Sequence, residues 1–458
     1  MIQKLVCHLQ LFSLTAGICF ASDATIWQKA TLVAEDRNAE HPNLWTGEGV
    51  GIGGVLFPSV NFTTAFGAST ADDPASLAVG HHDPDRDGWT IQNVEFSLEA
   101  RLGEHFRALA LYAAKIDLDD HWDDHFEEYY LTIENLPGDL RLRAGRFYTV
   151  FGFQNDRHPH EFDWADQYLM NGRFLGDDAL TVYGGEVSLR MLWSLPAGWS
   201  DRLTFSMGAV PDSDEHSHEH GAEHEEHEPE FEPEGALLQD WLTNVDYTAR
   251  YDYSENHRLA AGLSAAFGEN QYERNTQVYG LHLEYRWSEN GPGEPGRWFA
   301  WRTELALRHF GARSSDGPHE HGSHETGEHP EEHGMDLEED HNEAEHESHQ
   351  EHEREDEASH SVARRRDFTD LGFYTMVTYG WSERVALRVR AEWVSGVDEA
   401  GLDERWRFSP GISWRPTDQL DLLVRAQYNF DHSSSFGTEH SIWTQFVISW
   451  GGGHHHEH

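Results

Sequence analysis

The chain has little cysteine, few basic residues and no long hydrophobic run. Its 458 residues include 2 cysteines, Cys7 and Cys19, and both lie in the segment 1–22. If that segment is removed, neither a disulfide nor a thiolate metal site can form. Lysine and arginine number 33 against 82 acidic residues, which gives a formal net charge of −49 at pH 7. So negative a chain cannot neutralise phosphates, which excludes a nucleic-acid partner.

The segment 1–22 has the features of a secretory signal peptide. Lys4 supplies a positive charge, residues 9–20 are mostly apolar, and Cys19 and Ala21 are small residues suited to a cleavage site. Elsewhere no apolar run approaches the roughly 18 residues that suggest a transmembrane helix. The sequence therefore predicts an exported protein that is not an α-helical membrane protein, with residues 23–48 as an N-terminal mature segment.

Runs of alternating polar and apolar residues recur after residue 48. In the run 385–393, Leu387 and Val389 alternate with Arg388 and Arg390. The same period occurs at 139–144, 298–309 and 422–430. Such alternation predicts strands with one apolar and one charged face. The runs are about 10–14 residues long against the usual 5–6, which favours membrane-spanning strands over a soluble β-sandwich.

Short and long connections alternate between these runs. Short turns are expected near 102–105, 136–139, 194–200, 253–256, 289–296, 381–383 and 416–419. Long loops are expected near 68–90, 117–124, 150–179, 211–238, 268–274, 311–366, 395–403 and 431–438. This alternation predicts an all-β fold, a transmembrane antiparallel β-barrel of about 16 strands over residues 49–450, in the bacterial outer membrane. Tryptophans are expected to form its interfacial girdles: Trp287, Trp298, Trp301, Trp381, Trp393, Trp406, Trp414, Trp443 and Trp450.

Two inserts of low complexity are rich in histidine and acid. Residues 212–234 hold 5 histidines and 11 acids, and residues 316–360 hold 10 histidines and 18 acids. Both are expected to be disordered extracellular loops. Imidazole with carboxylate suits zinc or another divalent metal, bound transiently at many exchanging sites. The candidate ligands are His216, His218, His220, His224, His227, His319, His321, His324, His329, His333, His341, His346, His349, His352 and His360. A Gly/His tail, 451–458, follows the barrel.

Further candidates lie outside these inserts. His158, His160, Asp163 and Asp166 would form a cation relay if the loop 150–179 folds into the pore, and otherwise belong to an ordinary surface loop. The segment 81–87 resembles a calcium loop without its distal glutamate, and 121–125 could chelate or be a solvated loop tip. Isolated His282 and His309 are expected to be structural.

Arginines are expected on the lumen side of the strands. They pair across strands with glutamates or, if unpaired, form an anion pathway. The arginines are Arg141, Arg143, Arg302, Arg308, Arg388, Arg390 and Arg425, and the glutamates are Glu134, Glu304 and Glu392.

The segments 141–147, 150–156, 158–160, 163–164 and 172–176 carry a family resemblance. They resemble porin-like outer-membrane barrels with His-rich loops associated with zinc uptake and, more distantly, the phosphate-selective porins. The resemblance implies a barrel pore whose loops attract zinc. The chain has no room for a plug domain and a 22-stranded barrel, so the expected uptake is passive.

The sequence thus predicts an outer-membrane porin-like channel that captures divalent metal, first of all zinc, and lets it diffuse to the periplasm. One alternative is an anion or oligosaccharide porin whose histidines only buffer metal. Another is a closed barrel that binds metal at the cell surface. No catalytic or organic-cofactor motif is apparent, so an enzyme is not expected. Outer-membrane lipid and divalent ions are the expected partners, and a homotrimer is compatible with a 16-stranded porin.

Overall fold

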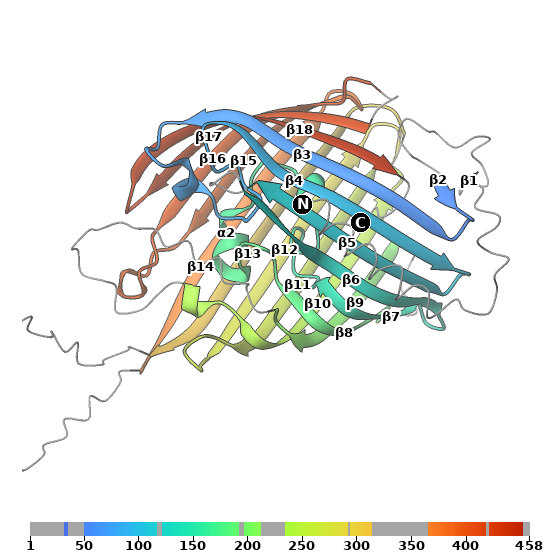
Figure 1. The fold of residues 1–458 in the computed structure, drawn as a ribbon, viewed down its shortest axis with the longest axis horizontal. Helices are drawn as coiled ribbons and strands as arrows, with labels where there is room; N and C mark the ends of the chain where they lie inside the picture. Colours follow the sequence, from blue (N-terminus) through green and yellow to red (C-terminus); the bar gives the residue numbers. More distant parts are fainter. Residues whose placement is uncertain are drawn as a thin grey trace, which may run out of the picture.

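Sixteen strands, β3–β18, form one closed antiparallel barrel in the described part of the chain (Figure 1). The computed structural model describes residues 32–34, 50–116, 121–191, 197–211, 234–291, 294–313, 365–417 and 421–451. Each strand pairs with its neighbours in sequence, and β18 closes the ring by pairing with β3. The predicted all-β, 16-stranded barrel is confirmed.

The barrel strands follow the alternating runs of the sequence. Their bounds are Leu56–Ser69 (β3), Gly88–Leu102 (β4), Phe106–Ile116 (β5), Trp122–Leu136 (β6), Leu140–Tyr148 (β7), Thr181–Leu189 (β8), Trp199–Ala209 (β9) and Gln239–Ser254 (β10). The second half comprises His257–Glu269 (β11), Asn275–Ser288 (β12), Trp298–Arg313 (β13), Arg365–Gly380 (β14), Val385–Val394 (β15), Arg405–Trp414 (β16), Asp421–Ser433 (β17) and Gly437–Gly451 (β18).

The barrel begins later than the sequence suggested. Two short strands, β1 (Leu32–Ala34) and β2 (Val50–Ile52), pair with each other before it. Gly53 and Gly54 separate β2 from β3 with φ values of 64° and 66°, a left-handed conformation that glycine adopts without steric cost. The barrel that was expected from residue 49 therefore begins at Leu56, after a turn at these two glycines.

The two rims differ largely as predicted. All seven expected short turns connect consecutive strands at one rim. At the other rim, 70–87 and 149–180 are long, but 270–274 and 434–436 are as short as the turns, because β11, β17 and β18 extend further than expected. The signal peptide, the tail and nearly all of both His-rich inserts lie outside the described residues.

The outer surface of the barrel is apolar. Large side chains that point away from the lumen include Phe96, Leu131, Leu263, Leu305, Leu387, Phe408 and Ile442. An apolar exterior around a closed barrel matches the hydrocarbon of a bilayer, since closure leaves no unpaired strand edge. The protein is accordingly an outer-membrane barrel. Trp443 was expected in an interfacial girdle, but it is only 4% exposed and shares the inner face of β18 with Gln445.

No helix in the described ranges is long and apolar enough to cross a membrane. The short helix α2 (Leu169–Leu175) instead lies inside the ring of strands and contacts β14 and β15 (Figure 1). It belongs to the connection 149–180, called here the inner loop. The inner loop contributes Trp164, Tyr168 and Phe174 to a buried apolar cluster. This cluster anchors the loop within the barrel.

Candidate functional site

A β-bulge in β6 directs two adjacent glutamates into the barrel. Across from it, Leu111 pairs with Glu128 and Tyr112 with Phe126, so Glu127 is the extra residue. In a regular strand, neighbouring side chains point to opposite faces, whereas a bulge changes their direction. Glu127 and Glu128 are both 1% exposed as a result. The bulge therefore places two carboxylates side by side where strand periodicity would give one.

These carboxylates hold His158 of the inner loop. Nδ1 of His158 lies 2.9 Å from Oε2 of Glu127, and Nε2 lies 2.9 Å from Oε2 of Glu128. Burial alone would lower the pKa of this imidazole, but its hydrogen bonds to the two carboxylates outweigh that effect and raise the pKa well above 6.5. Without a metal, His158 is therefore an imidazolium that donates from both nitrogens.

Two more histidines extend the cluster. Nδ1 of His160 lies 2.6 Å from Oε2 of Glu95 on β4, and Nε2 of His82 lies 3.2 Å from Oε1 of Glu127. We call the set Glu95, Glu127, Glu128, His82, His158 and His160 the histidine wall. Within the described residues, every ion pair of Glu95 and Glu127 is with a histidine. Ligand atoms of Glu95, Glu127 and His158 lie within 4.8 Å of one another, as a metal ion requires.

A second bulge, in β4, fixes the position of His82. Thr63 pairs with Asn93 and Thr64 with Ile91, which leaves Gln92 as the extra residue. The amide of Gln92 donates to the backbone oxygens of His82 and Ala165 at 2.6 and 2.7 Å. Its own backbone oxygen lies 2.8 Å from Nδ1 of His82. One irregular residue thus connects the barrel wall, the loop 70–87 and the inner loop.

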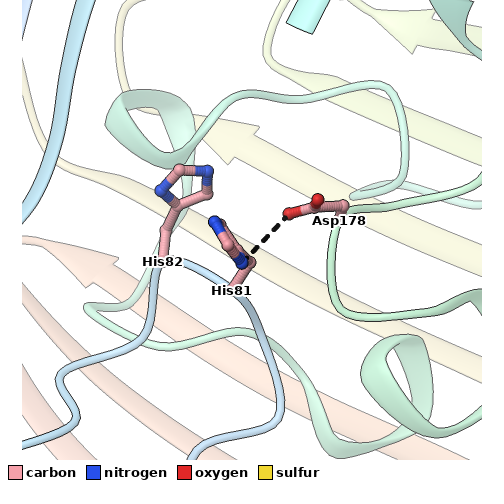
Figure 2. A group of neighbouring side chains, drawn as sticks. All are labelled: His81, His82 and Asp178. Atoms are coloured by element: carbon pink, nitrogen blue, oxygen red, sulfur yellow. Dashed lines mark ion pairs between the residues drawn. The ribbon is translucent and has the colours of Figure 1, made fainter. Parts of the chain in front are cut away.

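His81, His82 and Asp178 form a second group (Figure 2), and the loops that carry them lie at the rim of the long loops. His81 and His82 come from the loop after β3, and Asp178 comes from the end of the inner loop. Oδ1 of Asp178 is 3.8 Å from Nδ1 of His81, while Asp123 on β6 lies 3.1 Å from Nε2 of His81. The ligand atoms of this group also lie within 4.8 Å of one another.

The opposite wall is built from six arginines, five of which contact the inner loop, while Arg405 contacts Asp431 and the backbone oxygen of Leu77. We call Arg302, Arg308, Arg388, Arg390, Arg405 and Arg407, on β13, β15 and β16, the arginine wall. Asp163 forms ion pairs with Arg302 at 2.6 Å and Arg388 at 3.8 Å. Asp166 lies 2.8 Å from Arg390 and 3.0 Å from Arg407. The four residues proposed as a relay therefore occupy the lumen in two groups, with the histidines on one wall and the aspartates on the other.

The charge partners inside the barrel differ from those expected. Arg141 and Arg143 pair with Glu186 at 3.2 and 2.6 Å. Arg308 forms a two-point ion pair with Asp370 on the adjacent strand, at 2.7 and 3.0 Å. Arg390 contacts Glu392 two residues along its own strand, at 2.9 Å.

Three other predicted lumen residues have partners that the sequence did not indicate. Glu134 pairs with Arg107 on β5. Glu304 accepts hydrogen bonds from the backbone N–H of Phe153 and the hydroxyl of Tyr374. Arg425 donates to Gln445 and to the backbone oxygen of His160. The inner loop thus supplies several of the partners, which strand periodicity alone could not show.

The calcium-like run has no shared centre in the structure. Asp83 accepts hydrogen bonds from backbone N–H groups of Val79, Gly80 and Gln167 at 2.7–3.0 Å. Burial and nearby Asp166 raise the pKa of Asp83 to about 6. Asp87 instead accepts from the N–H of Ser69. These aspartates fix loops in place, and Asp83 joins the loop 70–87 to the inner loop.

Sequence reasoning missed Glu95, Glu127 and Glu128. The available signal was Glu127 beside Glu128 in a strand, because two adjacent acids interrupt a period of two. All fifteen histidines of the inserts lie outside the described residues, so their expected metal binding stays a prediction.

No family model and no curated protein matches the chain. Solved structures of similar architecture include the anion-selective porin from Comamonas acidovorans, at 9% identity and a TM-score of 0.45, covering 86% of this chain and 98% of that chain. The outer membrane channel DcaP of Acinetobacter baumannii matches at 9% identity and a TM-score of 0.43, covering 86% of this chain and 96% of that chain. Salmonella typhi OmpF in complex with daunomycin matches at 9% identity and a TM-score of 0.47, covering 86% of this chain and 97% of that chain. All three are porin-type outer-membrane β-barrels.

Proposed function

We propose that this barrel is an outer-membrane channel for divalent metal cations, with zinc as the first candidate. The histidine wall supports this proposal. It brings three buried carboxylates together with three imidazoles inside the lumen. Nitrogen and oxygen donors without thiolate suit Zn²⁺ and related ions. A metal ion that enters would replace protons on the imidazoles and neutralise the carboxylates.

The His-rich inserts would act before the lumen does. Their 29 acidic residues create a field that concentrates cations at the outer surface, and their 15 histidines bind metal weakly and exchange it quickly. Weak binding favours transfer of the metal ion from the inserts to the lumen over its storage in the inserts. Uptake is then passive diffusion from the loops through the barrel to the periplasm.

The alternative anion porin relies on the arginines. The described ion pairs count against it, because Arg302, Arg308 and Arg390 each contact at least one carboxylate within 3 Å. Paired guanidinium groups attract an anion less than unpaired ones do. A barrel that only binds metal at the surface is the remaining alternative, and it would conduct no ions.

The decisive experiment is ion selectivity of the refolded full-length protein in planar bilayers, together with zinc entry into liposomes that contain a zinc indicator. We expect cation selectivity and zinc entry. Removing residues 212–234 and 316–360 should reduce entry at low zinc while leaving conductance at high salt unchanged. Anion selectivity without zinc entry would overturn the proposal in favour of the anion porin. Absence of conductance would favour the surface binder.

A further inference from the structure

We propose that His81, His82 and Asp178 form a divalent-metal site at the extracellular end of the lumen, and that the ammonium group of Lys115 occupies this site until a metal ion displaces it. The inference deepens the proposed function and rests on it for its biological role. The site itself stands on geometry that is independent of ion flow.

The first observation is the direction of the His81 lone pair. Nζ of Lys115 lies 3.2 Å from Nδ1 of His81 and donates to the backbone oxygen of the same residue at 2.9 Å. An ammonium group has donors only, so Nδ1 of His81 must accept and carries no proton. Its proton is then on Nε2, which lies 3.1 Å from Asp123. The lone pair of Nδ1 is therefore directed at a cation, as in a metal ligand.

The second observation is that both histidines have a polar group behind the site, and that the one behind His82 orients its ring. A metal-bound histidine usually donates its other N–H to a carboxylate or a backbone carbonyl, which fixes its ring. Asp123 lies on this side of His81, 3.1 Å from Nε2, although the two atoms do not form a hydrogen bond. The backbone oxygen of Gln92 serves His82, since that oxygen accepts and Nδ1 of His82, 2.8 Å away, must donate. The ring of His82 is thus held in place before any metal binds.

Lys115 reaches the site because of strand register. It is the partner of Asp123 across β5 and β6, and both side chains contact His81 from the barrel wall. Asp178, from the inner loop, approaches the same nitrogen of His81 at 3.8 Å (Figure 2). A tethered positive charge beside two nitrogen ligands and one oxygen ligand competes directly with a divalent cation. The site therefore binds metal more weakly than the same ligands would without Lys115.

This arrangement has a consequence for transport. His82 also contacts Glu127 of the histidine wall at 3.2 Å, so the proposed site adjoins the deeper carboxylates. A site of reduced affinity at the entrance releases its ion readily to the next ligands. Lys115 would then set the zinc concentration at which the proposed site becomes occupied. Its ammonium group would return to the site each time a metal ion moves further into the lumen.

The test measures zinc protection of individual histidines in the full-length protein. Diethyl pyrocarbonate modifies histidine, and mass spectrometry reports each modified peptide separately, so the histidines of the inserts do not obscure His81. We expect half-protection of His81 in Lys115→Met at about tenfold lower zinc than in the wild type, because a like charge in contact has been removed. In Asp178→Asn, which loses an anionic ligand at a partly exposed position, half-protection should require about tenfold more zinc.

Arg190→Met is the matched control. It removes one positive charge at the other rim, and half-protection of His81 should stay at the wild-type zinc concentration. Equal half-protection in the wild type, Lys115→Met and Asp178→Asn would overturn the inference, as would absence of protection in all of them. Zinc entry into liposomes is scored separately. Protection in the expected order without zinc entry would retain the site and reject the channel, and zinc entry without protection would do the reverse.

Discussion

The inner loop is held between two walls whose buried charges have different chemistry. On the arginine wall, guanidinium groups, which stay protonated in proteins, form fixed ion pairs with Asp163 and Asp166. On the histidine wall, carboxylates contact His158 and His160, whose protons would leave in exchange for a metal ion under the proposed function. The comparison indicates that one wall anchors the inner loop, whereas the other would supply exchangeable ligands in the proposed pathway.

The largest expected effect comes from breaking a buried pair associated with the arginine wall. Arg308 and Asp370 have side chains that are 0% exposed and form a two-point ion pair. Arg308→Met leaves Asp370 buried without its guanidinium, which should cost about 3–5 kcal/mol in the free energy of unfolding. Urea unfolding of the refolded barrel in lipid vesicles measures this loss.

Its control is an exposed ion pair between β14 and the loop that follows β15. Arg366 contacts Glu399 at 2.8 Å, with both side chains more than a third exposed. Arg366→Met should change the free energy of unfolding by less than about 1 kcal/mol. Equal losses in the two variants would contradict the assignment of Arg308 as an anchor.

The next largest effect is expected on zinc entry, and it concerns the histidine wall. Glu127→Gln keeps the shape of the side chain but removes a carboxylate from the histidine wall, and we expect zinc entry into liposomes to fall by about tenfold or more. Glu104→Gln, in an exposed turn at the other rim, is the matched control and should leave entry unchanged. Unchanged zinc entry in Glu127→Gln would remove the histidine wall from the pathway.

A smaller effect appears in the pH dependence of stability. The carboxylates of Glu127 and Glu128 raise the folded-state pKa of His158 well above its unfolded value of about 6.5. The stability from this contact is therefore complete below about pH 6.5 and is lost as the pH rises through the folded-state pKa. We expect His158→Gln to cost about 2 kcal/mol near pH 6 and progressively less at higher pH, as measured by urea unfolding.

The exposed His105 provides the comparison for that measurement. His105→Gln should show no such trend, because its side chain contacts the backbone oxygen of Glu134 and, within the described residues, forms no ion pair with a carboxylate. A cost for His158→Gln that is constant from about pH 6 to about pH 10 would show that the contact does not depend on an imidazolium.

Much of the fold could be predicted from local pattern. Alternation around Leu387 and Arg390 identified β15 and its inner face, and the turns after β4 and β6 lie where expected. Inner-loop residues His158 and Asp166 were recognised as candidates, but their partners were not. Those partners are distant in sequence, and Glu127 points inward only because a bulge adds one residue to β6. Period-two reasoning cannot place such a residue.

The sequence by itself determined the barrel, because a lipid-facing strand must alternate and a closed sheet must satisfy its backbone hydrogen bonds. It also determined the excess of acid and histidine. Only the tertiary structure decided which histidines meet which carboxylates inside the lumen. Burial permits a charged group only beside a compensating partner. The path of the inner loop across the lumen decides which partner each buried charge meets. On one wall carboxylates meet imidazoles of the loop, and on the other guanidinium groups meet its carboxylates.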